Sequence, residues 1–285
     1  MFALLFLLFV LAVVAAPPPG LDLDDLGGWS ARADALLDGP AGCFEIEGQA
    51  SVRVAVFTPG GVMGKPQRVE STLAGPFTGR LEDGLWTRLD HQLVPVDGTG
   101  KLEIAEVPVH PMVGRVSHEG EQPEEGQEEK EGEHGSVSVG MTGEGVVVGA
   151  QAWSQAANLV DEIIDAVDPD TVLVWASWDE DRQGVQVVQT MPLGRRAAAG
   201  EVTVRSLHPL DGGPERLDME LPNRIRMGDW PARVTLLEPQ LHLVSLPTPH
   251  GPMPARESLS TILGVMGFTL GYEQDLAYHL ATPCD

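Results

Sequence analysis

Three adjacent carboxylates, Asp179, Glu180 and Asp181, form the densest acidic cluster in the part of the chain expected to fold. Such a cluster offers the hard oxygen ligands that calcium prefers, although it lacks the alternating spacing of a calcium-binding loop. Acidic residues are also common at hairpin tips, where their side chains accept hydrogen bonds from free backbone N–H groups. We therefore favour a turn at this position, and we expect neither a bound metal nor a cofactor.

Two other residues are candidates for a site. His208 lies in a predicted strand, where an inward histidine is more often a hydrogen-bonded core residue than a ligand. Trp230 lies between Asp229 and Pro231 and could form the rim of a cavity, although core packing is the more common role of a tryptophan. If the protein were an enzyme, His208 and the carboxylates at 179–181 would have to converge in a cleft.

Established catalytic motifs are missing from the sequence. It contains no Gly-x-Ser-x-Gly elbow, no His-Glu-x-x-His zinc helix, no phosphate-binding loop and no Cys-x-x-Cys pair. We therefore assign no catalytic residue and expect a non-enzymatic protein.

The N-terminus predicts export. Residues 1–16 form an apolar run that is too short to span a bilayer and ends in small residues, as in a cleavable signal peptide. We place the cleavage site after Ala15 and expect a periplasmic or secreted protein with no later membrane span. Because no Lys or Arg precedes the apolar run, an uncleaved anchor is the alternative.

The two cysteines, Cys43 and Cys284, fit this compartment. An even number of cysteines in an exported chain indicates a disulfide bond, which would here join the beginning of the fold to its last residues. Chain ends often lie close together on a domain surface, which makes the pairing plausible. Two free thiols are the alternative.

The charge of the chain limits its partners. Its 42 acidic and 18 basic residues give a formal net charge of −24, which repels nucleic acids and anionic lipid headgroups. Much of the acidity lies in residues 119–134, a run that cannot form a core and predicts a disordered loop. Nearby histidines make a metal-binding or partner-binding tail the alternative, but ligands need a preformed geometry.

The period of the apolar residues predicts the elements that would position these residues. Helical spacing predicts helices over 24–37, 152–167 and 255–266, and alternation predicts strands over most of the remaining chain. These include a hairpin over 77–89 and strands at 184–191, 201–207 and 216–221, a central covered strand at 171–178, and a second hairpin of 233–237 with 241–246. The Asp83-Gly84 turn of the first hairpin should place Leu81 opposite Trp86.

These elements predict an α+β fold, in which two or three helices pack on a curved, mainly antiparallel sheet. Residues 17–285 should form a single β-rich domain, and its segments 24–118 and 135–285 could be two related halves on either side of the acidic loop.

This arrangement resembles the half-barrel carriers of periplasmic lipoproteins. A signal sequence is followed by a helix and long strands, helices recur between strand groups, and residues 222–237 look like a late strand pair with Trp-Pro before an apolar strand. The resemblance implies an apolar groove capped by helices, with a lipid or a lipoprotein acyl chain as its ligand. The acidic insertion, the cysteines and the charge depart from it, and no functional residue is transferred.

The expectation is therefore an exported, non-enzymatic protein that binds an apolar ligand or a protein partner in the cell envelope. A structural or envelope-assembly protein without a small ligand is the first alternative. An enzyme of unrecognised type is the second.

Overall fold

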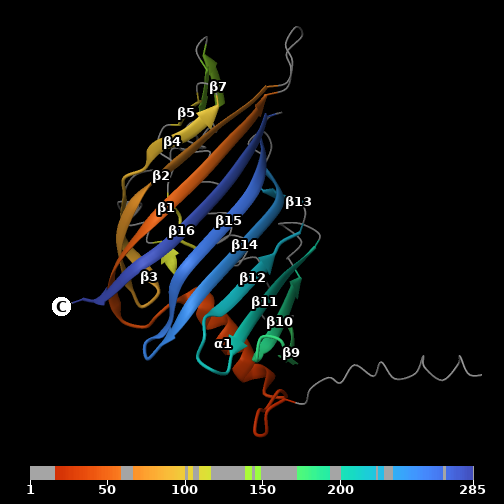
Figure 1. The fold of residues 1–285 in the computed structure, drawn as a ribbon. Helices are drawn as coiled ribbons and strands as arrows, with labels where there is room; N and C mark the ends of the chain where they lie inside the picture. Colours follow the sequence, from red (N-terminus) through yellow and green to blue (C-terminus); the bar gives the residue numbers. More distant parts are fainter. Residues whose placement is uncertain are drawn as a thin grey trace, which may run out of the picture.

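A computed structural model describes residues 17–58, 67–99, 102–104, 109–116, 139–142, 145–148, 172–192, 200–222, 224–227, 234–265 and 268–284. The predicted signal peptide, the acidic run 119–134, the predicted helix 152–167 and Trp230 lie outside these ranges. Within them the chain forms one helix, α1 (Leu26–Asp38), and a large open antiparallel sheet (Figure 1).

The first and last strands of the chain pair with each other near the middle of the sheet. Eleven strands follow one another in the order β6-β3-β2-β1-β16-β15-β14-β12-β11-β10-β9, with β4 paired to β2 and β13 to β14. All pairs are antiparallel except β3 with β6. Strand β1 therefore lies between β2, its neighbour in sequence, and β16, the last strand of the chain.

The bounds of the strands in this sheet are β1 (Cys43–Thr58), β2 (Gln67–Glu82), β3 (Leu85–His91), β4 (Val94–Thr99), β6 (Arg115–Val116), β9 (Leu173–Asp179), β10 (Gly184–Pro192), β11 (Glu201–Pro209), β12 (Glu215–Glu220), β13 (Arg224–Met227), β14 (Val234–Thr248), β15 (Gly251–Val265) and β16 (Phe268–Pro283). A separate small sheet has the order β5 (Leu102–Ile104), β8 (Gly145–Val148) and β7 (Val139–Thr142).

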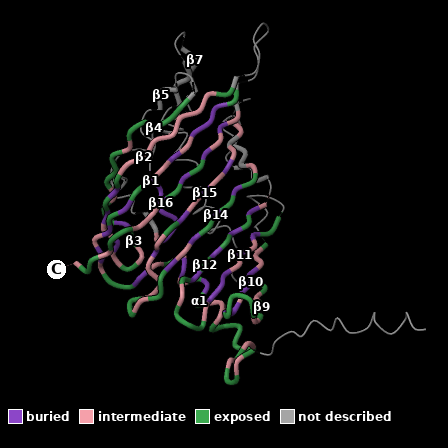
Figure 2. Tube along the Cα trace, viewed as in Figure 1, coloured by how far each residue is buried: buried purple, intermediate pink, exposed green. Residues whose placement is uncertain are grey.

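The two faces of the large sheet differ sharply. On β1, alternate side chains such as Val52, Val54 and Val56 are fully buried, while Arg53 on the other face reaches solvent. Figure 2 shows this alternation of buried and exposed residues along the strands. We call the buried side the covered face, because α1 and residues 109–114 lie on it, and the other side the open face.

Helix α1 forms where the sequence predicts it. Asp25 caps its start by accepting a hydrogen bond from the backbone N–H of Gly28 at 3.0 Å. Its buried residues, Ala33 and Leu36, face the sheet, and Ala33 packs in a cluster with Val185 and other apolar side chains of β9 and β10. Gly39 ends the helix with a φ of 81°, a conformation that favours glycine.

Several predicted strands are confirmed. The first hairpin turns at Asp83 and Gly84, which both have positive φ, and Leu81 pairs with Trp86. Strand β12 alternates as expected, with Leu217 and Met219 buried between exposed polar neighbours.

Two predicted elements are wrong. The helix predicted over 255–266 is absent, because residues 255–265 form most of β15 (Gly251–Val265), a strand paired with β14 and β16. Its Glu257, Leu259 and Thr261 are buried at alternate positions, which is the period of a strand. The second hairpin is a single strand, β14, because Glu238 and Pro239 form a bulge opposite one residue of β15 rather than a turn.

The strand predicted to be central is also misplaced. Strand β9 pairs only with β10 among the described residues, so it ends the series of strands. Its Leu173 and Trp175 are 67% and 46% exposed on the open face, while Val174 packs near α1. An apolar pattern on both sides of a strand therefore did not determine its place in the sheet.

Among the described residues, no helix is both long and apolar enough to cross a lipid bilayer. We expected two or three helices on the sheet. The described residues contain one helix, α1.

Candidate functional site

Among the described residues, two elements lie on the covered face, and buried polar side chains hold each of them there. The first is α1, which packs over β9, β10 and β15. The second is the segment of residues 109–114, which we call the buried segment. Its residues 109–113 are all buried although they belong to no helix or strand. The end of α1 touches it, because the N–H of Gly114 donates a hydrogen bond to the carbonyl of Leu37 at 2.8 Å.

The first polar group, the Glu215 cluster, consists of Arg32 on α1, Ser206 and His208 on β11, and Glu215 on β12. Nε and Nη2 of Arg32 donate hydrogen bonds to one carboxylate oxygen of Glu215 at 2.9 and 2.7 Å. The same oxygen lies 3.0 Å from Nδ1 of His208, whose Nε2 lies 2.9 Å from the hydroxyl of Ser206. The cluster thus connects the helix to two strands.

A hydroxyl, an imidazole and a carboxylate in this order also occur in nucleophilic catalysis. Here, however, Ser206, His208 and Glu215 are 2%, 0% and 4% exposed, and the ring of Trp29 on α1 lies 6.0 Å from that of His208. A substrate has no access to the hydroxyl of Ser206 in this structure. The contacts instead fasten α1 to the sheet.

A second set of hydrogen bonds attaches α1 to strand β10. The side-chain amide of Gln189 on β10 donates hydrogen bonds to Ser30 and Asp34 of α1, both at 2.9 Å. Burial raises the pKa of Asp34, and the nearby Asp38 adds to this effect, while the hydrogen bond from Gln189 opposes it.

The ionisation of Glu215 is set by its partners. Burial alone would raise its pKa, but hydrogen bonds from His208 and Arg32, together with their charges, outweigh burial and lower the pKa below its ordinary value. The Glu215 carboxylate is therefore a stable anion that faces a cation.

The second polar group, the Glu257 cluster, holds the buried segment. Gln274 on β16 pairs with the backbone of His110 in both directions, accepting from its N–H at 2.9 Å and donating to its carbonyl at 2.7 Å. The hydroxyl of Tyr272 donates to the same amide oxygen of Gln274. On the neighbouring strand β15, two residues before Leu259, which pairs with Gln274, Oε2 of Glu257 accepts from the N–H of Met112 at 2.6 Å.

Trp86 and the apolar core contact the two ends of the segment. The indole N–H of Trp86 donates to the carbonyl of Val113 at 2.7 Å, and Val109 packs in the apolar cluster around Trp86 and Phe77. At Gly39, a β-carbon would lie only 2.9 Å from the side chain of Val113, so the helix ends in close contact with the segment.

Glu257 differs from Glu215 in having no cation beside it. Among the described residues it forms no ion pair, and its Oε1 has no hydrogen-bond partner. Burial raises the pKa of Glu257 to about 8, against the smaller opposing effect of the N–H groups of Met112 and Val113. Burial likewise raises the pKa of the neighbouring Tyr272.

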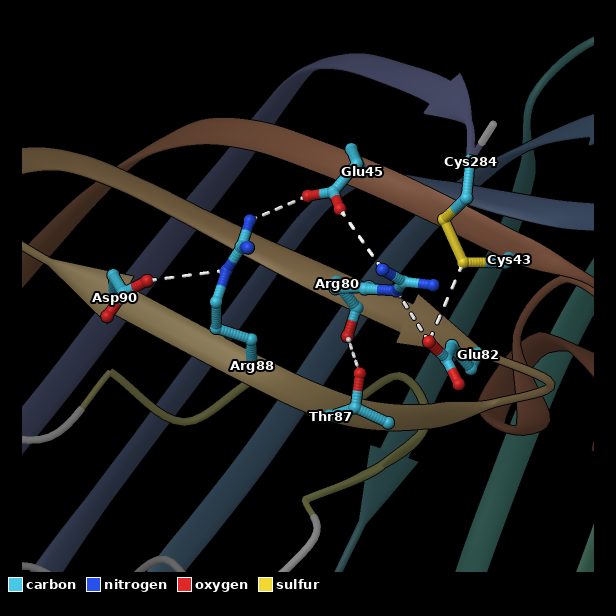
Figure 3. Close-up of polar contacts among 8 residues, drawn as sticks. All are labelled: Cys43, Glu45, Arg80, Glu82, Thr87, Arg88, Asp90 and Cys284. Carbon is cyan, nitrogen blue, oxygen red and sulfur yellow. Dashed lines mark hydrogen bonds and ion pairs between the residues drawn. A yellow bond between two sulfur atoms is a disulfide. The ribbon is translucent and has the colours of Figure 1, made fainter.

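The disulfide closes the seam between the first and last strands of the sheet. Cys43 and Cys284 are bonded, as the sequence predicts, with their Cα atoms 5.4 Å apart (Figure 3). The backbone N–H of Cys284 also donates to the carbonyl of Cys43. Beside them, on β1, β2 and β3, the open face carries a ladder of ion pairs that includes Arg88 with Glu45 at 2.7 Å.

The open face also has a hollow of about 300 Å³, lined by residues of β1, β2, β14, β15 and β16. Its floor contains Ala55, Phe57 and Gly271, and its walls include Arg53 and Glu273. Arg53 is paired with Glu70 and Glu273, so its charge is already balanced.

Of the residues that the sequence marked as candidates, the structure describes Asp179, Glu180, Asp181 and His208, while Trp230 lies outside the described ranges. Asp179, Glu180 and Asp181 lie at the tip between β9 and β10, where Asp179 accepts from the N–H of Arg182 at 3.1 Å. His208 lies in the Glu215 cluster, on the opposite side of the strand from solvent. Within the described ranges, no three His, Cys, Asp or Glu side chains are arranged to hold a metal ion.

Sequence reasoning missed Glu215, Glu257 and Gln274. A signal was present, because each occupies an inward position in a strand that otherwise alternates apolar and polar residues. A charged residue in that register indicates a buried polar contact. The segment that Glu257 and Gln274 hold had no such signal.

The chain was compared with protein-family models, curated proteins and solved structures, and none of them matches it.

Proposed function

We propose that this chain is an exported, non-enzymatic protein whose sheet curves into a half-barrel and binds an apolar ligand, an acyl chain, against the covered face. One observation supports this most: an irregular segment, 109–113, fills an apolar sheet face as a separate occupant. A face of this kind can accept another extended, apolar occupant in its place.

The chemistry of the covered face fits such a ligand. Its centre is made of aliphatic side chains, among them Val54, Leu241, Leu243 and Leu270, each at most 1% exposed. Glu215, Glu257 and Gln274 on this face contact α1 or the buried segment, and the aliphatic side chains near them would be uncovered together with these polar groups if a cover moved. The disulfide favours the oxidising compartment in which such a carrier would work.

Native mass spectrometry of protein purified from its host tests this function directly. A lipid of defined mass should accompany the folded protein. The delipidated protein should then bind the fluorescent acyl probe 11-(dansylamino)undecanoic acid saturably, in competition with unlabelled fatty acid.

Two substitutions on β14 locate the binding face. Leu241→Phe adds volume to the covered face and should weaken probe binding about tenfold, roughly the effect of the 1–3 kcal/mol that overpacking costs. Leu246→Phe is the matched control, because Leu246 is 47% exposed, and it should bind like the wild type. Absence of both lipid and saturable probe binding would contradict the proposal and favour an envelope-assembly protein without a small ligand.

A further inference from the structure

The buried segment is held unusually for a loop. Loops normally run over the surface, because their backbone polar groups need water. Here the sheet supplies side-chain partners instead, namely Gln274 for His110, Glu257 for Met112 and Trp86 for Val113. The segment thus rests on the sheet as a bound peptide would, through contacts that can be broken without separating any strands.

We infer that residues 109–113 are a strap over the covered face, latched by Glu257, and that ionisation of Glu257 in neutral to alkaline solution releases it. The release of the strap stands on its own geometry. Its consequence, admission of an acyl chain, rests on the proposed function.

Glu257 is the latch because it is the member of the cluster whose charge changes without a compensating partner. Gln274 and Trp86 are neutral donors and acceptors at any pH. Among the described residues, the other titratable groups facing the cluster are His110 of the strap itself and Tyr272 of β16, while β14 presents the aliphatic Leu243 opposite Glu257. No ion pair of Glu257 occurs within the described ranges.

The direction of the switch follows from the environment of the carboxyl group. In the closed strap, burial raises the pKa of Glu257 to about 8, whereas an open strap would expose the carboxyl to water and return it toward 4.5. The closed form therefore binds the proton more tightly. Between these two values the ratio of open to closed strap should rise by roughly tenfold per pH unit.

Opening should spare the sheet. Strands β15 and β16 keep their backbone ladders with β14 and β1, and the disulfide anchors the end of β16. Among the contacts of the described residues, opening breaks those of the strap with Gln274, Glu257 and Trp86 and the adjoining hydrogen bond between Gly114 and Leu37, and it breaks no pairing between strands.

Hydrogen–deuterium exchange of the intact chain measures the strap without any ligand. After correction for intrinsic rates, peptides that cover 109–114 should exchange roughly 100-fold faster at pH 7.5 than at pH 5.5 in the wild type. Glu257→Gln mimics the protonated carboxyl and should remove this dependence. Two controls should retain it: His110→Gln, which removes the other titratable group of the strap, and Glu220→Gln, an exposed site on β12.

If hydrogen exchange of residues 109–114 depended on pH equally in the wild type and in Glu257→Gln, the proposal that Glu257 latches the strap would be overturned. Loss of the pH dependence in His110→Gln alone would overturn it as well. A second arm uses 11-(dansylamino)undecanoic acid. Faster probe binding at pH 7.5 than at 5.5, lost in Glu257→Gln, supports strap and function together. Strap opening without probe binding would retain the strap and reject the proposed function, whereas pH-independent probe binding would retain the function and reject the strap as its gate.

Discussion

Two buried glutamates on one face of the large sheet have pKa values that are shifted in opposite directions. Glu215 and Glu257 are 4% and 1% exposed, and they lie opposite Ser245 and Leu243, two residues apart on β14. Glu215 faces Arg32 and His208 and has a lowered pKa, while Glu257, among the described residues, accepts from backbone N–H groups alone and has a pKa raised to about 8. Burial acts to raise the pKa of both carboxyls, and at Glu215 the hydrogen bonds and charges of His208 and Arg32 outweigh it.

The two clusters also differ in what they hold. The Glu215 cluster fastens a helix through a charge pair, which does not depend on pH near neutrality. The Glu257 cluster fastens an irregular segment through a carboxyl close to its ionisation point. One is therefore suited to a permanent attachment and the other to a reversible one.

The largest expected effect comes from the disulfide, which supports the strand that carries Gln274. Replacement of Cys43 and Cys284 by alanine should lower the free energy of unfolding by about 3–5 kcal/mol, because a long loop of the unfolded chain is no longer closed. Urea denaturation measures the loss. Hydrogen exchange should then increase first in β16 and the buried segment and least in β11 and β12; uniform loosening would show that the two regions are not separable.

Removal of the charged partner should affect the other cluster. Glu215→Ala leaves the ring of His208 without its carboxylate and Arg32 without its pair, and should cost about 3 kcal/mol in urea denaturation. Glu220→Ala, at an exposed position of the same strand, should stay within about 0.5 kcal/mol of the wild type. A similar small effect at Glu215 would mean that α1 does not depend on this cluster.

The pH dependence of stability should have opposite signs at the two glutamates. Protonated Glu257 is favoured by the fold, so its contribution is full below about 4.5 and is lost as pH rises toward 8, by up to about 2.7 kcal/mol between pH 5.5 and 7.5. Glu215 contributes above 4.5 and loses its contribution as pH falls through its lowered pKa. Thermal or urea unfolding of the wild type, Glu257→Gln and Glu215→Gln from acidic to mildly alkaline pH measures both contributions. If each glutamate changed the free energy of unfolding with pH in the same direction, the contrast would be refuted.

The smallest effect should come from the acidic run. Deletion of residues 119–133 should leave the melting temperature within a few degrees and both pH profiles unchanged, because such a sequence buries no apolar surface. Calorimetry of the deletion variant provides the check. A cooperative loss of folding would mean that this run supports one of the two clusters.

Much of the fold could be predicted from local patterns. The turn at Asp83 and Gly84 required positive φ, the alternation of β12 marked its inward face, and the cysteines indicated their own bond. Each of these signals is contained in a few neighbouring residues, or in residue type and compartment.

The errors arose where long-range pairing overrode local pattern. Ala255, Glu257 and Leu259 are common in helices, yet pairing on both sides made them a strand. Pro239 indicated a turn, but a bulge accommodated it within β14. The place of β9 at the end of the described strand order could not be predicted, and neither could the burial of residues 109–113 against the sheet. Both depend on contacts between segments distant in sequence.

The most direct test of the contrast is the titration of the two carboxyl groups themselves. Carbon-13 NMR of the folded protein with labelled glutamate side chains follows each carboxyl carbon through pH, and Glu257→Gln and Glu215→Gln identify the two signals. The account predicts a midpoint of about 8 for Glu257 and one below 4.5 for Glu215. A midpoint near 4.5 for Glu257 would contradict it, because the buried segment would then be held by an ordinary, solvated carboxylate.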